Sequence, residues 1–199
     1  MDEKIAKIKN ALGSGSINIF GLPYSGKDTL GKQLAEALGA KFISSGDVVR
    51  ANSEKLRNSE NSDLGFLTPT AEFSAVMEDY LKSQTGNEAL ILSSVGRWHG
   101  EEAGILQALT ESGHELKHVI YLKISEEEIW RRWESAKKLG DRGRRYDDTS
   151  PENLRRRIDE FKEKTLPVIE YYQKMGLLIE VDGERDRNEV FADVVNILA

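Results

Sequence analysis

The chain has 199 residues, 39% of them hydrophobic and 31% charged, which is the composition of one globular domain with a real core. Its formal net charge of −6 argues against a general nucleic-acid binder, and no run of about 18 apolar residues predicts a membrane-spanning helix. The chain has no cysteine, which excludes disulfides and cysteine-type zinc sites, and no apolar signal segment, so we expect a cytoplasmic protein without membrane or nucleic-acid partners.

Apolar runs and amphipathic segments alternate along the whole chain. Runs such as "SINIF" and "KHVIYLKI" are typical of buried strands, and stretches with apolar residues three and four apart are typical of helices. In chain order we expect a helix at 3–12, a strand at 16–20, a loop at 21–26, a helix at 27–38, a strand at 41–44, a helical start within 46–60, a helix at 68–81, strands at 89–93 and 117–124, helices at 125–139 and 150–175, a strand at 177–182 and a helix at 186–198. This alternation predicts a single α/β domain with a parallel sheet.

Several helix ends carry local signals. Gly39 is the expected end of the helix that follows the first loop, because glycine readily adopts the left-handed conformation of a helix end. Thr68 is the expected N-cap of the helix that follows it, with a proline at the first helical position. Ser125 and Glu128 have the spacing of a capping box. Pro167 should bend or divide the long helix before the last strand.

Basic residues are concentrated in one part of this acidic chain. Residues 131–157 hold ten Lys or Arg and five Asp or Glu, a local charge of +5. Such a basic island indicates an anionic ligand held locally. A solvated basic helix–loop–helix is the alternative.

The loop at 21–26 has the composition of a phosphate-binding loop. Gly21, Gly26 and Lys27 meet the pattern G-x-x-x-x-G-K between an expected strand and an expected helix. Glycines allow positive φ and close approach of the backbone, so that successive N–H groups surround phosphate oxygens at the helix N-terminus. Lys27 adds a positive charge for the β and γ phosphates. Chance glycines in a surface turn are the alternative.

The residues around Lys27 depart from the general pattern. Asp28 comes next and the hydroxyl follows at Thr29, with Pro23 inside the loop. This spacing resembles the adenylate kinase family of nucleoside monophosphate kinases, whose loop reads G-x-P-G-x-G-K-G-T. Tyr24 and Asp28 replace glycines of that pattern. A carboxylate beside a phosphate is costly, so we expect Asp28 to point away along the helix.

The resemblance extends over nearly the whole chain from residue 17. The stretch "FISSGDVVRA" resembles the family's strand followed by S-T-G-D-x-x-R, in which the arginine, here Arg50, binds the acceptor phosphate. "GRRYDDTSPENLRRRI" is similar to a G-R-x-D-D stretch before a helix with R-x-R, and "EVDGERDRNEVFADVVNIL" is similar to the closing strand, V-D-G loop and helix. The resemblance implies a P-loop NTPase fold of three α/β/α layers, with a five-stranded parallel sheet, a small helical insertion that binds the nucleoside monophosphate at about 45–75, and a short lid at about 137–146.

Helical periodicity separates the arginines of the helix at 125–139. Ile129, Trp133 and Ala136 form its inward stripe. At 100° per residue, Arg132 lies about 60° from the centre of that stripe and Arg131 lies on the opposite side. We therefore expect Arg132 to reach a site and Arg131 to be solvated.

The same reasoning applies to the helix that begins after Ser150. Its inward stripe runs from Leu154 to Thr165, and Arg157 borders it. Arg155 lies further round the helix, and Arg156 faces away. Arg132 and Arg157 are also the positions that the family resemblance selects.

The expected lid contains two glycines and five cations, which suit a flap that closes over ATP and excludes water. Without cysteine it cannot hold the zinc of long-lid family members. Arg145 is selected only by the R-x-D-D spacing, and Arg144 is the alternative. Asp147 and Asp148 are expected to orient the arginines.

The segment "SSVGRWHGE" stands where the family's fourth strand ends D-G-F-P-R-T-x-x-Q. Arg97 keeps the arginine that holds the acceptor phosphate. Ser93 replaces an aspartate that helps to organise the water shell of magnesium, which leaves Asp47 for that task. Glu101 replaces the glutamine that reads the acceptor adenine, and Thr68 replaces an apolar residue of the same pocket.

Glu101 bears on which base the acceptor carries, but it does not decide between guanine and adenine. A carboxylate can only accept hydrogen bonds, so it suits the two adjacent donors of guanine better than adenine or cytosine. Hydrogen bonding alone therefore favours GMP, whereas the family default is AMP. The alternative is that Glu101 points to solvent and that the "GEE" run caps the next helix.

Together these features predict an enzyme that transfers a phosphoryl group from ATP, with Mg²⁺ and without zinc, to a nucleoside monophosphate, and that is a monomer. The residues expected to bind the donor are Gly21, Tyr24, Ser25, Gly26, Lys27, Asp28, Thr29 and Arg132. The residues expected to bind the acceptor are Ser45, Arg50, Thr68, Arg97 and Glu101. The residues expected to act on the transferred group are Lys27, Arg97, Arg132, Arg145 and Arg157, with Thr29 and Asp47 near the metal. The alternatives are a kinase of another small phosphate acceptor and a nucleotide-binding regulator that has lost turnover.

Overall fold

The computed structural model describes residues 1–52, 70–139 and 150–199, except for the side chains of residues 47, 50, 51, 70–73 and 139. Its elements are α1 (Asp2–Leu12), β1 (Ser16–Gly21), α2 (Lys27–Leu38), β2 (Lys41–Ser44), α3 (Ser45–Ala51), α5 (Thr70–Lys82), β3 (Leu90–Ser93), α6 (Glu102–Glu111), β4 (Leu116–Lys123), α7 (Glu126–Leu139), α8 (Pro151–Glu160), the π-helix η2 (Phe161–Thr165), α9 (Leu166–Lys174), β5 (Leu178–Asp182) and α10 (Arg187–Leu198). The strands and helices expected from the sequence are confirmed wherever the structure describes them.

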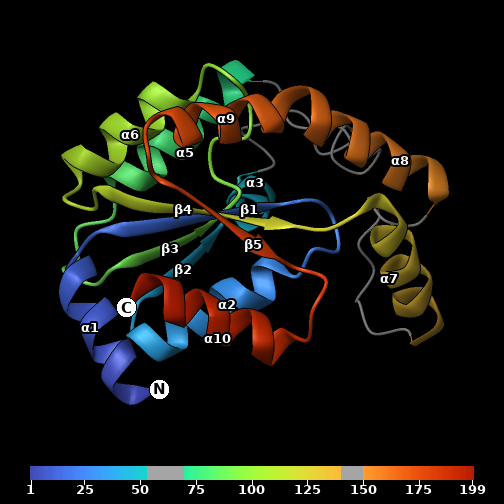
Figure 1. The fold of residues 1–199 in the computed structure, drawn as a ribbon. Coiled ribbons are helices and arrows are strands. Elements are labelled where there is room, and N and C mark those ends of the chain that lie inside the picture. The colour runs from blue at the N-terminus through green and yellow to red at the C-terminus, as the bar shows by residue number, and fades with distance from the viewer. Residues whose placement is uncertain (53–69, 140–149) are drawn as a thin grey trace.

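The five strands form one parallel sheet in the order β2-β3-β1-β4-β5. β1 lies at its centre, between β3 and β4, and Figure 1 shows helices on both faces. Parallel strands must be joined by crossovers, and these crossovers cover the faces of the sheet with helices. The three-layer α/β/α fold with a five-stranded parallel sheet is therefore confirmed.

The alternation of side chains along β1 separates two hydrophobic cores. Ile17 and Ile19 face the core beneath α1, α2 and α10, whereas Phe20 faces the core beneath α5, α6 and α9. Every residue of β1 is buried, which is typical of a central strand covered on both faces. The apolar run at this position, interrupted only by Asn18, is the sequence signature of that double burial.

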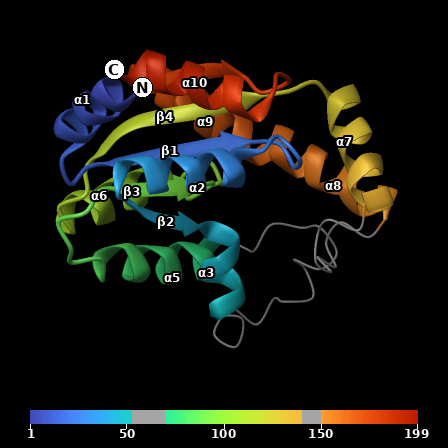
Figure 2. The same ribbon diagram turned by 90° about the horizontal axis from the view of Figure 1, so that it is seen from below.

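Both chain ends lie on the side of the sheet that carries α1 and α10 (Figures 1 and 2). Lys4 Nζ donates to Asn196 Oδ1 at 2.7 Å and joins the first helix to the last. Among the helices that the structure describes, none is both long and apolar enough to cross a membrane.

The predicted division of the helix at 150–175 is confirmed. Ser150 caps α8 by accepting a hydrogen bond from the N–H of Asn153 at 3.2 Å. The helix then widens into η2 and resumes as α9, which has Pro167 in its first turn. Proline cannot donate to the preceding turn and clashes with it, which explains why the regular hydrogen-bond pattern ends just before this position. The predicted cap at Thr68 lies outside the described residues.

Candidate functional site

The loop between β1 and α2 needs glycine at its two ends for different reasons. A Cβ on Gly21 would lie 2.5 Å from Ser25 Oγ and 3.0 Å from the carbonyl oxygen of Leu122, so no side chain fits there. Gly26 has a φ of 91°, which other residues rarely adopt. Tyr24 also has a positive φ, 64°, so this residue holds a conformation at which glycine would be less strained. The loop geometry predicted from the pattern is thus present, and Tyr24 adopts positive φ at one of its turns.

Ser25 Oγ is buried and has no hydrogen-bond partner among the described residues. Buried polar atoms are normally paired, so a polar atom of this kind inside a loop fits a site that binds a polar ligand. Lys27 is the first residue of α2, and Lys27 and Thr29 are both partly buried. The N-terminus of α2 follows the loop directly, as an anion site requires.

Asp28 does not point away along the helix, and the expectation that it does is wrong. Its carboxylate Oδ1 accepts a hydrogen bond of 2.6 Å from Ser93 Oγ. Ser93 ends β3, the strand beside β1, so the two residues meet although 65 positions separate them in the chain. A tertiary contact from the neighbouring strand therefore sets the direction of the Asp28 side chain.

A pocket of about 510 Å³ opens at the end of this loop. This volume lies within the range of small-molecule sites, about 300–1,000 Å³. Its wall is formed by the loop, α2, α7 and the segment between β5 and α10. The lining residues include Tyr24, Ser25, Gly26, Thr29, Gln33, Arg131, Arg132, Gly183, Glu184, Arg185 and Arg187.

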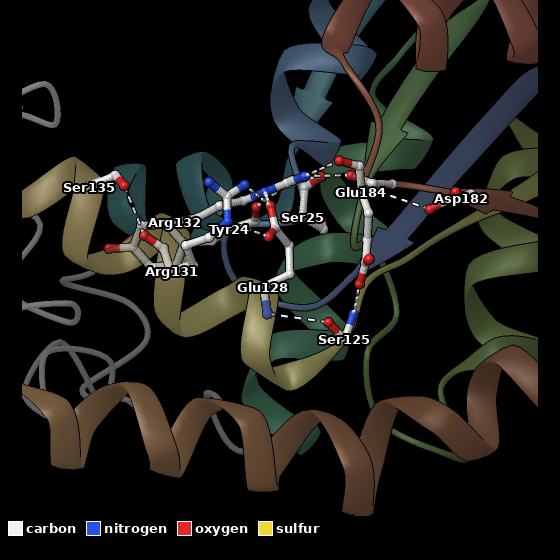
Figure 3. A network of polar contacts seen from close by, with 10 residues as sticks. Tyr24, Ser25, Ser125, Glu128, Arg131, Arg132, Ser135, Asp182 and Glu184 are labelled. Carbon is white, nitrogen blue, oxygen red and sulfur yellow. Dashed lines mark hydrogen bonds and ion pairs between the residues drawn. The ribbon is translucent and has the colours of Figure 1, made fainter.

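Arg132 connects three walls of this pocket, as Figure 3 shows. Its guanidinium donates to the carbonyl oxygens of Tyr24 at 3.2 Å and Ser25 at 3.3 Å. It also donates to the carbonyl oxygens of Gly183 at 2.7 Å and Glu184 at 3.3 Å. The inward direction of Arg132 predicted from helical periodicity is confirmed, and so is the solvent exposure of Arg131, 68%. Arg131 nevertheless also lines the pocket, so it does not lie on the side opposite to the site.

Glu128 holds both arginines (Figure 3). Its carboxylate accepts two hydrogen bonds of 2.6 Å from Arg131 and one of 2.6 Å from Arg132. The hydrogen bonds from Arg131 and then Arg132 lower the pKa of Glu128 to about 2, although partial burial opposes this shift. The carboxylate is therefore ionised at any pH at which the protein would work.

The predicted capping box of α7 is half correct. Ser125 Oγ accepts a hydrogen bond from the N–H of Glu128 at 3.2 Å, as expected. The N–H of Ser125 donates instead to Glu184 at 2.7 Å, because the Glu128 side chain binds the two arginines. Glu184 thereby joins the start of α7 to the segment after β5.

The segment after β3 is shaped by two residues with positive φ, Ser94 at 53° and Gly96 at 68°. The amide of Asn18, buried in β1, donates to the carbonyl oxygen of Val95 at 2.8 Å and holds this turn. Thr165, the last residue of η2, donates to the carbonyl oxygen of Arg97 at 3.0 Å. The backbone at Arg97 is thus positioned from both the sheet and the π-helix.

Glu101 is only 3% exposed, so the alternative that it points to solvent is wrong. It accepts hydrogen bonds from Ser74 Oγ at 2.9 Å and from the N–H of Trp98 at 3.1 Å, and its side chain makes no cap hydrogen bond to α6. Burial raises its pKa, although these hydrogen bonds and the charge of Arg97 oppose the shift. Burial, the largest of these effects, thus favours the protonated form of this carboxyl group.

Magnesium is the metal that the sequence implies, and we expect it to bind through ATP phosphates and water rather than directly to side chains. No group of three or more His, Cys, Asp or Glu among the described side chains could enclose a metal ion. Asp28 and Thr29 lie at the start of α2, and such oxygen atoms suit a cation that keeps most of its water and binds phosphate.

Comparison with known proteins agrees with this geometry. The sequence model of the adenylate kinase family matches residues 19–177. The chain belongs to the adenylate kinase family. An adenylate kinase of Rhizobium meliloti is 32% identical over 186 residues, which cover 90% of this chain and 97% of that protein. Adenylate kinases of Lachnoclostridium phytofermentans and Methanosarcina barkeri are 27% and 28% identical, and each match covers 92% of this chain. Membership of the family identifies the chain as an enzyme, a nucleoside monophosphate kinase.

The predicted site residues divide into three sets in this adenylate kinase fold. Tyr24, Ser25, Gly26, Thr29 and Arg132 line the pocket, and Gly21, Lys27 and Asp28 lie in the loop and helix beside it. Arg97 and Glu101 lie together after β3, and Ser45 is buried at the start of α3. The side chains of Asp47 and Arg50 and all of Thr68, Arg144, Arg145, Asp147 and Asp148 lie outside the described residues.

Arg156 and Arg157 are both partly buried, so burial does not separate them. Arg156 lines a shallow hollow with Trp130 and Arg155, separate from the pocket at the loop. The expectation that Arg156 faces away from the apolar stripe stays a prediction. Arg157 stays a predicted site residue.

The sequence prediction missed Glu128, Asn18, Thr165 and Glu184. Glu128 was interpreted only as a capping residue, although its spacing of four from Arg132 is the signal for an ion pair on a helix. Asn18 is a polar residue inside an apolar strand, which is itself a signal of a buried hydrogen bond. Helical periodicity placed Thr165 on the inward stripe, but nothing local marks its contact with Arg97, and nothing local marks Glu184.

Proposed function

We propose that the chain transfers the γ-phosphoryl group of MgATP reversibly to AMP. The observation that supports this most is the pocket at the end of the phosphate loop, whose wall Arg132 builds from three segments of the chain. Phosphoryl transfer asks an enzyme mainly for positioning and for stabilisation of charge. A loop of backbone N–H groups beside fixed guanidinium groups supplies both.

In this proposal ATP lies with its phosphates in the loop and its base in the pocket. Lys27 binds the phosphates, and Thr29 lies near the metal. A bound magnesium ion would supply positive charge that neutralises the phosphates. Arg132 orients the loop and the segment after β5 through their carbonyl oxygens.

The acceptor is proposed to bind on the side of Arg97. Arg50 and Arg97 would form paired hydrogen bonds with its phosphate. Arg145 and Arg157 would neutralise charge on the transferred group. The acceptor phosphate has its second pKa at about 6, so it is already ionised near neutral pH and no general base is required.

Glu101 is the residue proposed to discriminate between acceptor bases. Its buried carboxyl group lies beside Arg97 and accepts hydrogen bonds from Ser74 and from the N–H of Trp98. Hydrogen bonding to a carboxylate would suit guanine, whereas the relatives that cover most of the chain are adenylate kinases. We therefore place AMP first, and GMP and CMP behind it.

Segments 45–75 and 137–146 are proposed as the acceptor-binding insertion and the lid, and we propose a monomer. Incubation with ADP and Mg²⁺ alone tests the acceptor directly. The proposal expects ATP and AMP to form in equal amounts. If ADP stays unchanged while ATP phosphorylates GMP, the acceptor is GMP.

A nucleotide-binding regulator without turnover is the second candidate, because Asp28 and Ser93 depart from the family pattern together. It would bind ATP and show no transfer to any monophosphate. The chain keeps Arg97 and Arg157 in addition to the residues that would bind ATP. This favours the enzyme, because a protein that only binds a nucleotide requires fewer arginines.

A further inference from the structure

Asp28 and Ser93 form a polar pair at the carboxyl edge of the sheet. Ser93 is the last residue of β3, is 1% exposed, and pairs in register with Ile19 of β1, two residues before Gly21. Ligands of open parallel sheets bind outside the carboxyl ends of the strands. The pair therefore lies on the ligand side of the sheet, beside the phosphate loop.

The position of Asp28 creates an electrostatic conflict. It lies in the first turn of α2, where backbone N–H groups favour negative charge. The same N–H groups and Lys27 attract phosphate, so a bound phosphate and the Asp28 carboxylate repel each other. A cation that binds the phosphates and faces the carboxylate would turn this repulsion into attraction.

Ser93 fixes the orientation of the Asp28 side chain. Its hydroxyl donates to Asp28 Oδ1 at 2.6 Å, which limits rotation of the carboxyl group. Ser93 is itself buried at the end of β3, so its position is set by the sheet. The serine thus holds a carboxyl oxygen at a defined place beside the loop.

We propose that Asp28, held by Ser93, is a positioning residue for magnesium and accepts hydrogen bonds from the water shell of the ion that ATP carries. Magnesium keeps several of its waters and is usually bound through one or two carboxylates and substrate phosphates, so one oriented carboxylate suffices. The inference rests on the proposed function, because it requires MgATP in the loop. In this inference Asp28 accepts hydrogen bonds from the metal-bound water, and Ser93 orients Asp28 for that contact.

The test measures the affinity for ATP by calorimetry, without any acceptor, once with Mg²⁺ and once with EDTA. The ratio of the two affinities is the metal enhancement. Asp28→Asn should lower this ratio by about tenfold, since one hydrogen-bonded charge is lost. Binding in EDTA should stay equal or become tighter, because the repulsion is removed. Glu36→Gln changes an exposed carboxylate of the same helix and should keep the wild-type ratio.

An exchange variant provides the second arm. Asp28→Ser combined with Ser93→Asp moves the carboxylate to its partner and keeps the composition of the pair, so it should restore most of the enhancement that Asp28→Ser loses. An unchanged ratio in Asp28→Asn overturns the inference, as does an exchange that restores nothing. A wild-type protein that binds no ATP in either condition contradicts the proposed function and removes the premise of this inference.

Discussion

Glu128 gives the sharpest prediction about the pocket. Glu128→Gln removes the charge that holds Arg132, while the four carbonyl contacts of Arg132 remain available. A pKa of about 2 in place of the usual 4.5 corresponds to about 3 kcal/mol of stabilisation at neutral pH. Although Arg131 lowers the pKa most, it is 68% exposed, so solvent screening reduces this contribution and we expect a loss of about 1–2 kcal/mol.

The pH dependence follows from the direction of that shift. Because the folded protein holds the proton of Glu128 less tightly than the unfolded chain, its contribution is fully present above pH 4.5 and is lost as the pH falls towards 2. Glu128→Gln should therefore destabilise the protein at pH 7 and have little effect near pH 2. It should also weaken ATP binding by about fivefold to tenfold, since Arg132 loses the carboxylate that orients its guanidinium towards the loop.

Urea denaturation at several pH values and calorimetric titration with ATP measure both effects. Glu127→Gln is the matched control, because Glu127 is an exposed acid of the same helical turn. If Glu128→Gln and Glu127→Gln behave alike in both measurements, the ion pairs of Glu128 contribute nothing and the reasoning about Arg132 is refuted.

The other predictions concern charge at the site. Lys27→Ala should abolish turnover and leave the thermal midpoint unchanged, and a near-native rate would remove the loop from the mechanism. Arg157→Ala should lower kcat, because it removes about 2–4 kcal/mol of transition-state stabilisation, whereas Arg156→Ala should have a much smaller effect. Equal losses of kcat in the two variants would refute the assignment from helical periodicity. Burial raises the pKa of Glu101, so its contribution to stability is present below pH 4.5 and decreases as the pH rises through the folded-state value. Glu101→Gln should therefore be more stable relative to wild type at pH 8 than at pH 4. A difference in free energy of unfolding that is the same at both pH values would contradict this. In kinetic assays, an unchanged AMP/GMP ratio of kcat/KM in Glu101→Gln would show that Glu101 does not read the base.

The elements of the fold were predictable because their signals are local. The apolar run of β1, the Gly39 helix end and the cap at Ser150 each depend on residues within a few positions of one another. Helical periodicity similarly placed Arg132 towards the site and Arg131 towards solvent, since the apolar stripe of α7 determines which side faces the protein.

The contacts that could not be predicted join distant parts of the chain. Asp28 meets Ser93 across 65 positions, and Ser125 meets Glu184 across 59, so no local pattern reports either bond. The direction of the Asp28 side chain depends on a hydrogen bond from the neighbouring strand, which the residues around Asp28 do not reveal. The burial of Glu101 likewise depends on packing against α5, which supplies Ser74.

Transfer of labelled γ-phosphate from ATP to AMP, GMP, CMP, UMP and dTMP tests the central claim most directly. With Mg²⁺ present, the wild-type protein should label at least one nucleoside monophosphate, with AMP first, and Lys27→Ala should label none. Absence of label in all five, from a protein that still binds ATP, would contradict the assignment as a nucleoside monophosphate kinase.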